Sequence, residues 1–180
     1  MNTTSIAIDR EYPRWSETLR DGSHVVVRPI GQLDREAERR FIEDLSPEAR
    51  RFRFLGQVAR PSERMLDALV DIDPAREAAF AAVVKDGAGE RFVGISRYSA
   101  DPDGLRCECA VTVMDDWQHK GLGSMLMRHL VDVARARGMS SLYSVDSAEN
   151  VAMTDLAHFL GFRTTRDPED PGQLMHELML

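Results

Sequence analysis

The sequence predicts a single α/β (α+β) domain, with a mixed, mostly antiparallel sheet of six to seven strands flanked by helices. Three observations lead to this prediction. A chain of 180 residues that is 43% hydrophobic and 29% charged has the composition of one globular domain. Runs rich in β-branched residues follow one another in the first half of the chain. The second half alternates strand, helix, strand and helix, which adds a β-α-β unit to the sheet.

The first elements are a strand and three helices. Residues 24–29 (HVVVRP) are rich in β-branched residues and predict a strand. Asp34 suits the N-cap of a helix that ends near Leu45. Ser46-Pro47-Glu48 then starts a short helix with proline at its first position, and residues 62–70 have the apolar spacing of a third helix.

The remaining elements are mostly strands, with one long helix among them. Residues 86–89 (DGAG) are a hairpin turn between two strands. Gly138 is a good terminator for the long helix because glycine readily adopts the left-handed conformation that ends helices. In chain order we expect strands at 79–85, 92–99 and 106–114, a helix at 121–137, a strand at 141–146, a helix at 151–160 and a last strand at 173–180.

The domain is expected to span residues 21–180. Residues 1–20 are predicted to be a lead-in that is either poorly ordered or an edge element. The chain begins without a basic segment followed by an apolar stretch, and nowhere do eighteen apolar residues run together. Neither export nor membrane spanning is indicated, so the expected location is cytoplasmic.

Charge and metal-ligand spacing exclude several classes of function. The net charge of −7 argues against binding to nucleic acid or to an anionic membrane, since both require a basic face. Cys107 and Cys109 are two residues apart in a predicted strand and are expected to be core thiols. The five histidines show no metal-ligand spacing with each other or with these cysteines, so no metal is expected.

The most informative segment joins the predicted strand 106–114 to the long helix. Gln118-His119-Lys120-Gly121-Leu122-Gly123 places two glycines at the opening turn of that helix. Backbone N–H groups there lack intrahelical partners, and the positive end of the helix dipole favours an anion. Glycine lets a diphosphate approach the main chain, and Lys120 could add one charge. The alternative is that the glycines only permit a tight strand-to-helix turn.

A rival interpretation of the same segment is dinucleotide binding. Gly121-x-Gly123 follows a strand, and Asp146 closes the next strand at a plausible distance for a ribose contact. However, Leu126 stands where that fingerprint needs a third small residue, and too little chain follows Asp146 for the further strands of such a sheet.

The residues resemble a known family. Gln118-x-x-Gly121-x-Gly123 after a strand, followed by Glu149-Asn150 and by Leu160-Gly161-Phe162, resembles the GNAT superfamily of N-acetyltransferases over roughly residues 22–165. Within the superfamily the likeness is closest to the acetyltransferase domain of bacterial protein-lysine acetylases. That likeness depends on Asp21-Gly22 before residues 25–29, on Ser46-Pro47-Glu48-x-Arg50-x-x-Arg53-Phe54, and on Asp115-Asp116-Trp117-Gln118.

The resemblance implies an acyltransferase that binds acetyl-CoA as acyl donor. Main-chain groups of Val111, Thr112 and Val113 would bind the pantetheine arm as an added strand does. Residues of the turn that begins at Gln118 would hold the pyrophosphate through main-chain N–H groups: His119, Lys120, Gly121, Leu122, Gly123 and Ser124. Asn150 would hydrogen-bond the pantetheine, although its position equally suits an ordinary N-cap.

Glu108 is the candidate general base. Alternation along the strand places its carboxylate on the face opposite Cys107 and Cys109, where it could deprotonate an acceptor ammonium. The resemblance supports this role, because the lysine acetylases have a catalytic glutamate at the matching position. The alternative is an edge charge that discourages aggregation. Asp115 and Asp116 are weaker candidates for the base and fit better as turn residues.

The resemblance implies direct attack of the amine within a ternary complex. The superfamily often has a tyrosine seven residues after the asparagine, but this chain has Ala157 there, so a tyrosine acid is excluded at that position. On resemblance alone the expected acceptor is a protein lysine. A small-molecule amine and a catalytically silent acyl-CoA-binding sensor remain alternatives. Subunits of this superfamily often share a C-terminal strand, which allows a homodimer.

Overall fold

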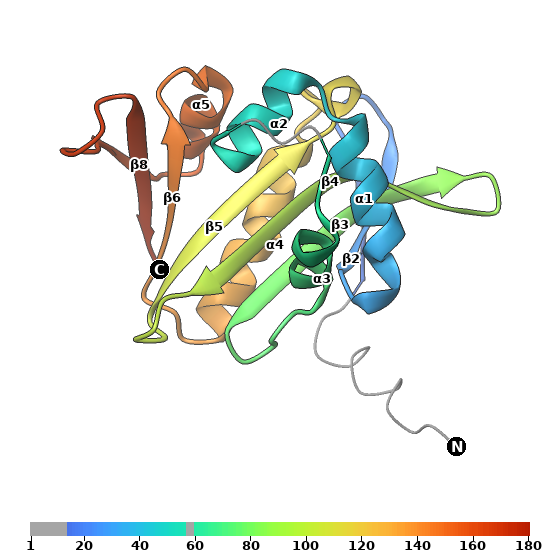
Figure 1. Cartoon of the computed structure of the whole chain (residues 1–180), viewed down its shortest axis with the longest axis horizontal. Coiled ribbons are helices and arrows are strands. Elements are labelled where there is room, and N and C mark those ends of the chain that lie inside the picture. Colours follow the sequence, from blue (N-terminus) through green and yellow to red (C-terminus); the bar gives the residue numbers. More distant parts are fainter. Residues whose placement is uncertain (1–13, 57–59) are drawn as a thin grey trace.

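The computed structural model describes residues 14–56 and 60–180 of the chain (Figure 1). Its helices are α1 (Arg35–Asp44), α2 (Pro47–Phe54), α3 (Glu63–Val70), α4 (Leu122–Ala136) and α5 (Val151–Phe159). Its strands are β1 (Trp15–Thr18), β2 (His24–Pro29), β3 (Glu77–Asp86), β4 (Gly89–Ala100), β5 (Arg106–Val113), β6 (Ser141–Ser147), β7 (Arg163–Arg166) and β8 (Gln173–Met179). Two short 3-10 helices cover Gln32–Asp34 and Asp115–Trp117.

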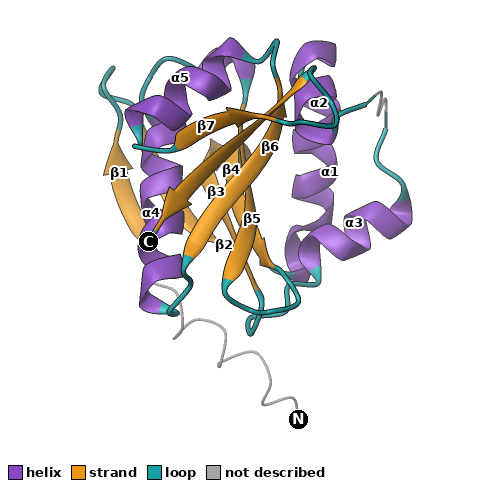
Figure 2. Cartoon of the chain, turned by 90° about the vertical axis from the view of Figure 1, so that its left-hand side faces the viewer, coloured by secondary structure: helices purple, strands orange, loops and turns teal. Residues whose placement is uncertain are grey.

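The strands form one sheet in the order β1-β2-β3-β4-β5-β6-β8-β7. Every neighbouring pair is antiparallel except β5 and β6, which are parallel and are connected through α4. Figure 2 shows α1, α2 and α3 on one face of the sheet and α4 and α5 on the other. The predicted mixed, mostly antiparallel sheet with helices on both faces is therefore confirmed.

The sheet has eight strands, rather than the six or seven predicted, because β1 and β7 are only four residues long. Both are too short and too polar for a strand to be predicted from their residues. Strand β1 lies at the edge of the sheet, paired with β2, within the segment predicted to be a lead-in or an edge element. Residues 1–13 of that segment lie outside the described residues.

Two buried clusters fill the faces of the sheet. One packs α4 against β3, β4 and β5, and it includes Phe80, Leu126 and Leu130. The helix lies close to β4 because residue 94 is glycine: a Cβ there would lie 2.8 Å from Cδ1 of Leu126. The other cluster packs α1 and α3 against the opposite face.

The end of β5 is held to α2 by two hydrogen bonds. Asp115 Oδ1 accepts from the hydroxyl of Ser46 at 2.8 Å, and Asp115 Oδ2 accepts from the Ser46 N–H at 3.1 Å. The Ser46 hydroxyl in turn caps α2 by accepting from the Ala49 N–H at 3.1 Å. Asp115 therefore positions α2 beside the strand end and has the turn role that the sequence favoured for it.

Candidate functional site

The parallel strands β5 and β6 separate part way along their length. They pair over three positions, Arg106 with Ser141, Cys107 with Leu142 and Glu108 with Tyr143. Beyond these positions β6 continues beside β8, and β5 continues beside β4. Residues 109–113 of β5 therefore have a partner strand on one side only, and their other edge faces the gap.

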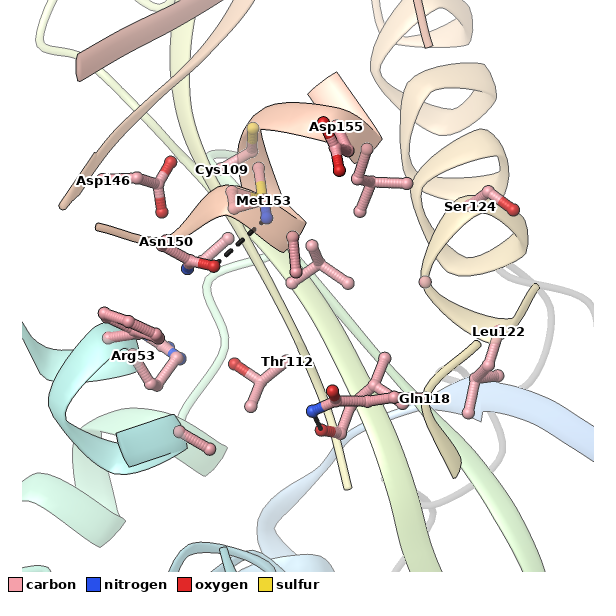
Figure 3. Close-up of a pocket in the computed structure, with 18 of the residues that line it drawn as sticks. Arg53, Cys109, Thr112, Gln118, Leu122, Ser124, Asp146, Asn150, Met153 and Asp155 are labelled. Atoms are coloured by element: carbon pink, nitrogen blue, oxygen red, sulfur yellow. Dashed lines mark hydrogen bonds between the residues drawn. The ribbon is translucent and has the colours of Figure 1, made fainter. Parts of the chain in front are cut away.

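A cavity of about 480 Å³ occupies this gap. Its walls come from β5, from β6 and from the first turns of α4 and α5, while α2 contributes Phe52 and Arg53 (Figure 3). The cavity brings together every sequence-predicted site residue except Lys120.

The backbone of Val111, Thr112 and Val113 forms one wall of the cavity. The Val113 carbonyl accepts a hydrogen bond from Nε2 of Gln118 at 3.3 Å, which ties the turn to the end of the strand. Gln118 therefore fixes the geometry of the wall, a role that the motif alone did not indicate.

The turn before α4 contains two residues with left-handed backbone, His119 with φ 61° and Gly121 with φ 87°. The first helical bond to the Gly121 carbonyl comes from the Met125 N–H at 3.1 Å. The N–H groups of residues 122–124 precede that bond, so the helix leaves them free for a ligand. Because the helix dipole adds partial positive charge here, the turn has the properties of a diphosphate site.

Lys120 does not line the cavity. Its ammonium lies 3.0 Å from Asp21 Oδ2 and 4.7 Å from the ring centre of Trp117. The cation beside the turn is Arg20, whose Nε would lie 3.2 Å from a Cβ on Gly121 and whose side chain lines the cavity. Arg20 was missed in the sequence because it lies in a different segment, which β1 and β2 bring to the turn.

Asn150 is the N-cap of α5 and also lines the cavity. Its Oδ1 accepts from the Met153 N–H at 3.1 Å, as Figure 3 shows. Its amide nitrogen makes no hydrogen bond within the described part of the chain. The capping role and the ligand role are therefore compatible, since they use different atoms of one side chain.

Glu108 projects from the face of β5 opposite the buried cysteines. Its side chain is exposed, whereas Cys107 and Cys109 are 0% and 3% exposed. It lines the main cavity and also a second cavity of about 240 Å³ on the side of α1 to α3. Glu108 thus stands where two cavities meet.

The cysteines are buried and free, as expected of core thiols. Burial raises the pKa of Cys107 to about 11, and it raises the pKa of Cys109 further. Neither is a thiolate at neutral pH, so neither is suited to act as a nucleophile. Within residues 14–56 and 60–180, no group of three or more His, Cys, Asp or Glu side chains has the arrangement of a metal site.

Three further charged residues line the cavity, Arg53, Asp146 and Asp155, and none of them was predicted as part of an acetyl-CoA site. The side chain of Arg53, on α2, is half-buried, and its guanidinium carbon lies 5.1 Å from the ring centre of Phe54. Burial and the nearby Arg97 lower its pKa to about 10, against the opposing effect of carboxylates that include Glu108 and Asp146. Asp146 of β6 is 17% exposed, and burial raises its pKa. Their roles depend on tertiary contacts that spacing along the chain does not indicate.

None of the helices in the described residues combines the length and apolar character that crossing a bilayer requires. This agrees with the absence of a long apolar run in the sequence.

Comparison with known proteins gives concordant matches. The model of the acetyltransferase (GNAT) family matches residues 39–162. The chain is 52% identical to acetyltransferase PA5475 of Pseudomonas aeruginosa, over 94% of this chain and 91% of that protein. It is 29% identical to acetyltransferase Pat of Mycolicibacterium smegmatis, over 89% of this chain but only 47% of that longer protein. The crystal structure of the GNAT domain of S. lividans PAT superposes with a TM-score of 0.85 at 28% identity, covering 94% of this chain and 99% of that domain.

Proposed function

The chain belongs to the acetyltransferase (GNAT) family, and from this premise we propose that it moves the acetyl group of acetyl-CoA to a lysine side chain of a protein. The family assignment makes it an N-acetyltransferase with acetyl-CoA as donor. The proposal concerns the residues that carry the reaction and the acceptor. The observation that carries it is the position of Glu108 at the junction of two cavities.

The donor is proposed to bind in the gap between β5 and β6. The free N–H groups at the start of α4 suit the pyrophosphate, and Arg20 adds a positive charge beside them. The free edge of residues 111–113 suits the amides of the pantetheine arm, which pair with it as an added strand does. The unused amide nitrogen of Asn150 is a donor for a pantetheine carbonyl on the opposite wall.

Glu108 is proposed to act as the general base. Its carboxylate takes a proton from the acceptor ammonium, directly or through one water. The nitrogen lone pair then attacks the thioester carbon, and a main-chain N–H near Val111 to Val113 stabilises the oxyanion. Collapse of the tetrahedral intermediate breaks the C–S bond, CoA leaves with the electron pair on sulfur, and the nitrogen gives its second proton to that thiolate or to water, which leaves the neutral amide. No covalent enzyme intermediate is needed, which agrees with the raised thiol pKa values of the two cysteines.

The lining of the second cavity suits an acceptor amine at the end of an apolar side chain. Ile72, Ala79 and Ala110 provide apolar walls. Glu77, Ser99 and Glu108 are cross-strand neighbours on β3, β4 and β5, so they form one polar row across its floor. A lysine side chain combines four methylenes with a terminal ammonium and matches both features.

The charges in the second cavity also favour a cationic acceptor. Glu77 and Glu108 are carboxylates on its floor. Arg97, which also lines it, is paired with the buried Glu38 at 3.2 Å, so its charge is compensated. Arg53 is the remaining cation, and it lies where the two cavities join.

The acceptor is tested by mass spectrometry. A lysate of the source cells is incubated with the chain and acetyl-CoA carrying a heavy-isotope acetyl group, and Glu108→Gln serves as the control. Heavy acetyl groups on protein lysines that are absent from the control would support the proposal. Labelling only on small amines or protein N-termini would overturn the lysine acceptor. If no label is transferred to any amine although acetyl-CoA binds, the chain is a silent binding module.

A further inference from the structure

The loop between β1 and β2 contacts the turn that precedes α4. Residues 19–23, the hairpin tip, are closed by two hydrogen bonds, from the Leu19 N–H to the Ser23 carbonyl at 2.8 Å and from the Gly22 N–H to the Leu19 carbonyl at 3.0 Å. Leu19 is buried and belongs to the cluster that packs α4 against the sheet. The hairpin tip is therefore anchored in the core beside the start of α4.

One contact joins the main chains of the hairpin tip and the turn. The Arg20 N–H donates to the Lys120 carbonyl at 3.1 Å. In a planar trans peptide the carbonyl and the following N–H point in opposite directions, so this bond directs the Gly121 N–H away from the hairpin tip. Gly121 lines the main cavity, and its N–H makes no hydrogen bond to another residue of the described part of the chain. The orientation of one donor proposed for the diphosphate thus depends on the hairpin tip.

Asp21 adds a second contact, and its two carboxylate oxygens have separate partners. Oδ1 accepts from the Ser23 N–H at 3.0 Å, within the hairpin tip. Oδ2 lies 3.0 Å from the ammonium of Lys120, which also lies 4.7 Å from the ring centre of Trp117. Neither Asp21 nor Lys120 lines the cavity, so their ion pair links the two segments from outside the proposed donor site.

The turn needs such support because its backbone is strained. His119 has φ 61°, in the left-handed region that is unfavourable for a residue with a Cβ atom. Backbone of this kind persists only where surrounding contacts hold it. Both contacts of the hairpin tip fall on Lys120, the residue between the two left-handed positions His119 and Gly121. The hairpin tip is therefore placed to hold the strained part of the turn.

We propose that Asp21 is a positioning residue for donor binding, because through Lys120 it holds the turn before α4 in the conformation that presents its N–H groups to the diphosphate of acetyl-CoA. This inference rests on the proposed binding of acetyl-CoA in the main cavity. It gives Lys120 an indirect role, since its ammonium binds Asp21 rather than the ligand.

The sign of the effect separates positioning from simple electrostatics. Acetyl-CoA is a polyanion, so a carboxylate close to its diphosphate repels it. If Asp21 acted only through its charge, removing that charge would strengthen binding, and a released Lys120 that reached the diphosphate would strengthen it further. The positioning role predicts weaker binding instead, because the turn loses its support together with the ion pair.

The test is the calorimetric dissociation constant of acetyl-CoA for Asp21→Ser. Serine keeps an oxygen that can accept from the Ser23 N–H but has no charge for Lys120. We expect the dissociation constant to rise about three- to fivefold, as the loss of one partly exposed ion pair implies. At saturating acetyl-CoA, kcat for the amine that the wild type acetylates should change less than about twofold. Lys120→Met should weaken binding by a similar factor, and the double variant no further, since both residues act through one pair.

Asp103→Ser is the matched control. Asp103 also precedes a glycine in a turn and accepts from the N–H two residues further along, that of Leu105, at 2.9 Å, but it lines neither cavity. This change removes the same charge and should leave the binding of acetyl-CoA unchanged. Binding by Asp21→Ser that is as tight as that of the wild type, or tighter, would overturn the inference, and so would an equal loss in Asp103→Ser.

These results leave the proposed function intact, because the wild type still binds acetyl-CoA. A wild type that binds no acetyl-CoA would overturn both the inference and the proposed function.

Discussion

Glu108 faces Tyr143 in the last position that β5 and β6 share before the two strands separate. The candidate base therefore lies on rigid backbone at the fork of the sheet, and the part of β5 that lines the main cavity begins at Glu108 itself. Catalytic groups on strands are held more accurately than groups on loops. In the proposed function the donor and the acceptor reach one carboxylate from opposite sides, because each of the two cavities includes Glu108 in its wall.

Replacing Gly121 by alanine should weaken acetyl-CoA binding. The backbone there has φ 87°, so alanine costs about 1–2 kcal/mol of stability. The added Cβ also occupies the surface that the diphosphate approaches, and we expect an increase in the dissociation constant of about tenfold, measured by calorimetry.

Gly138→Ala is the matched control for this change. Gly138 has φ 77° and ends α4 at the far end from the cavity, with no atom within 4 Å of an added Cβ. The Gly138→Ala variant should lose a similar amount of stability and should bind acetyl-CoA as tightly as the wild type does. Equal binding by both variants would show that the α4 turn does not hold the donor.

Two substitutions of Asn150 should separate its two roles. Asn150→Ser keeps a capping oxygen for the Met153 N–H, so stability should change by less than about 0.5 kcal/mol. It removes the amide donor, which should weaken acetyl-CoA binding about three- to tenfold. Asn150→Ala should lose both, with a stability cost of about 1 kcal/mol in urea unfolding.

The control for capping alone is Ser62→Ala. Ser62 caps α3 by accepting from the Met65 N–H at 3.1 Å, away from the cavity. The Ser62→Ala variant should be less stable than the wild type but should bind acetyl-CoA equally tightly. If Asn150→Ser binds acetyl-CoA as tightly as the wild type, Asn150 is an N-cap only.

Most of the fold was predictable because its longer elements carry strong local signals. The helix α2 begins at Pro47 after Ser46, and Gly138 follows the end of α4, as the sequence indicates. The strands β1 and β7 were not predicted, since four residues of mixed polarity are too few to show the alternation of apolar and polar residues that indicates a strand. Their strand conformation comes from pairing with β2 and β8, which is a tertiary effect.

The residues of the candidate site were also only partly predictable from the sequence. The glycine turn and Glu108 belong to one continuous segment, so their spacing predicts a shared site. Arg20, Arg53 and Asp146 reach the cavity from β1–β2, α2 and β6, and no local pattern links them. Lys120 belongs to the motif, and its ion pair with Asp21 is a further contact that no local pattern indicates.

The ion pair of Asp21 should contribute to the acid sensitivity of the fold. Hydrogen bonds from Ser23, and then the contact with Lys120, lower the pKa of Asp21 to about 2. A carboxyl group with a lowered pKa stabilises the fold above its ordinary pKa near 4, and this contribution is lost as the pH falls toward 2.

Asp21→Asn should therefore reduce the steepness of the stability loss between pH 4 and pH 2, measured by urea unfolding. Lys120→Gln should reduce it less, because the backbone bond from Ser23 remains. A profile that Asp21→Asn leaves unchanged would show that this pair does not affect folding.

The most direct test of the central claim is the effect of Glu108→Gln on turnover and on donor binding, measured on the same preparation. The substitution keeps the size of the side chain but cannot accept the ammonium proton. We predict that kcat for acetyl transfer falls about a hundredfold or more, while the calorimetric dissociation constant of acetyl-CoA changes less than about twofold. A variant that turns over at the wild-type rate would contradict the assignment of Glu108 as the base.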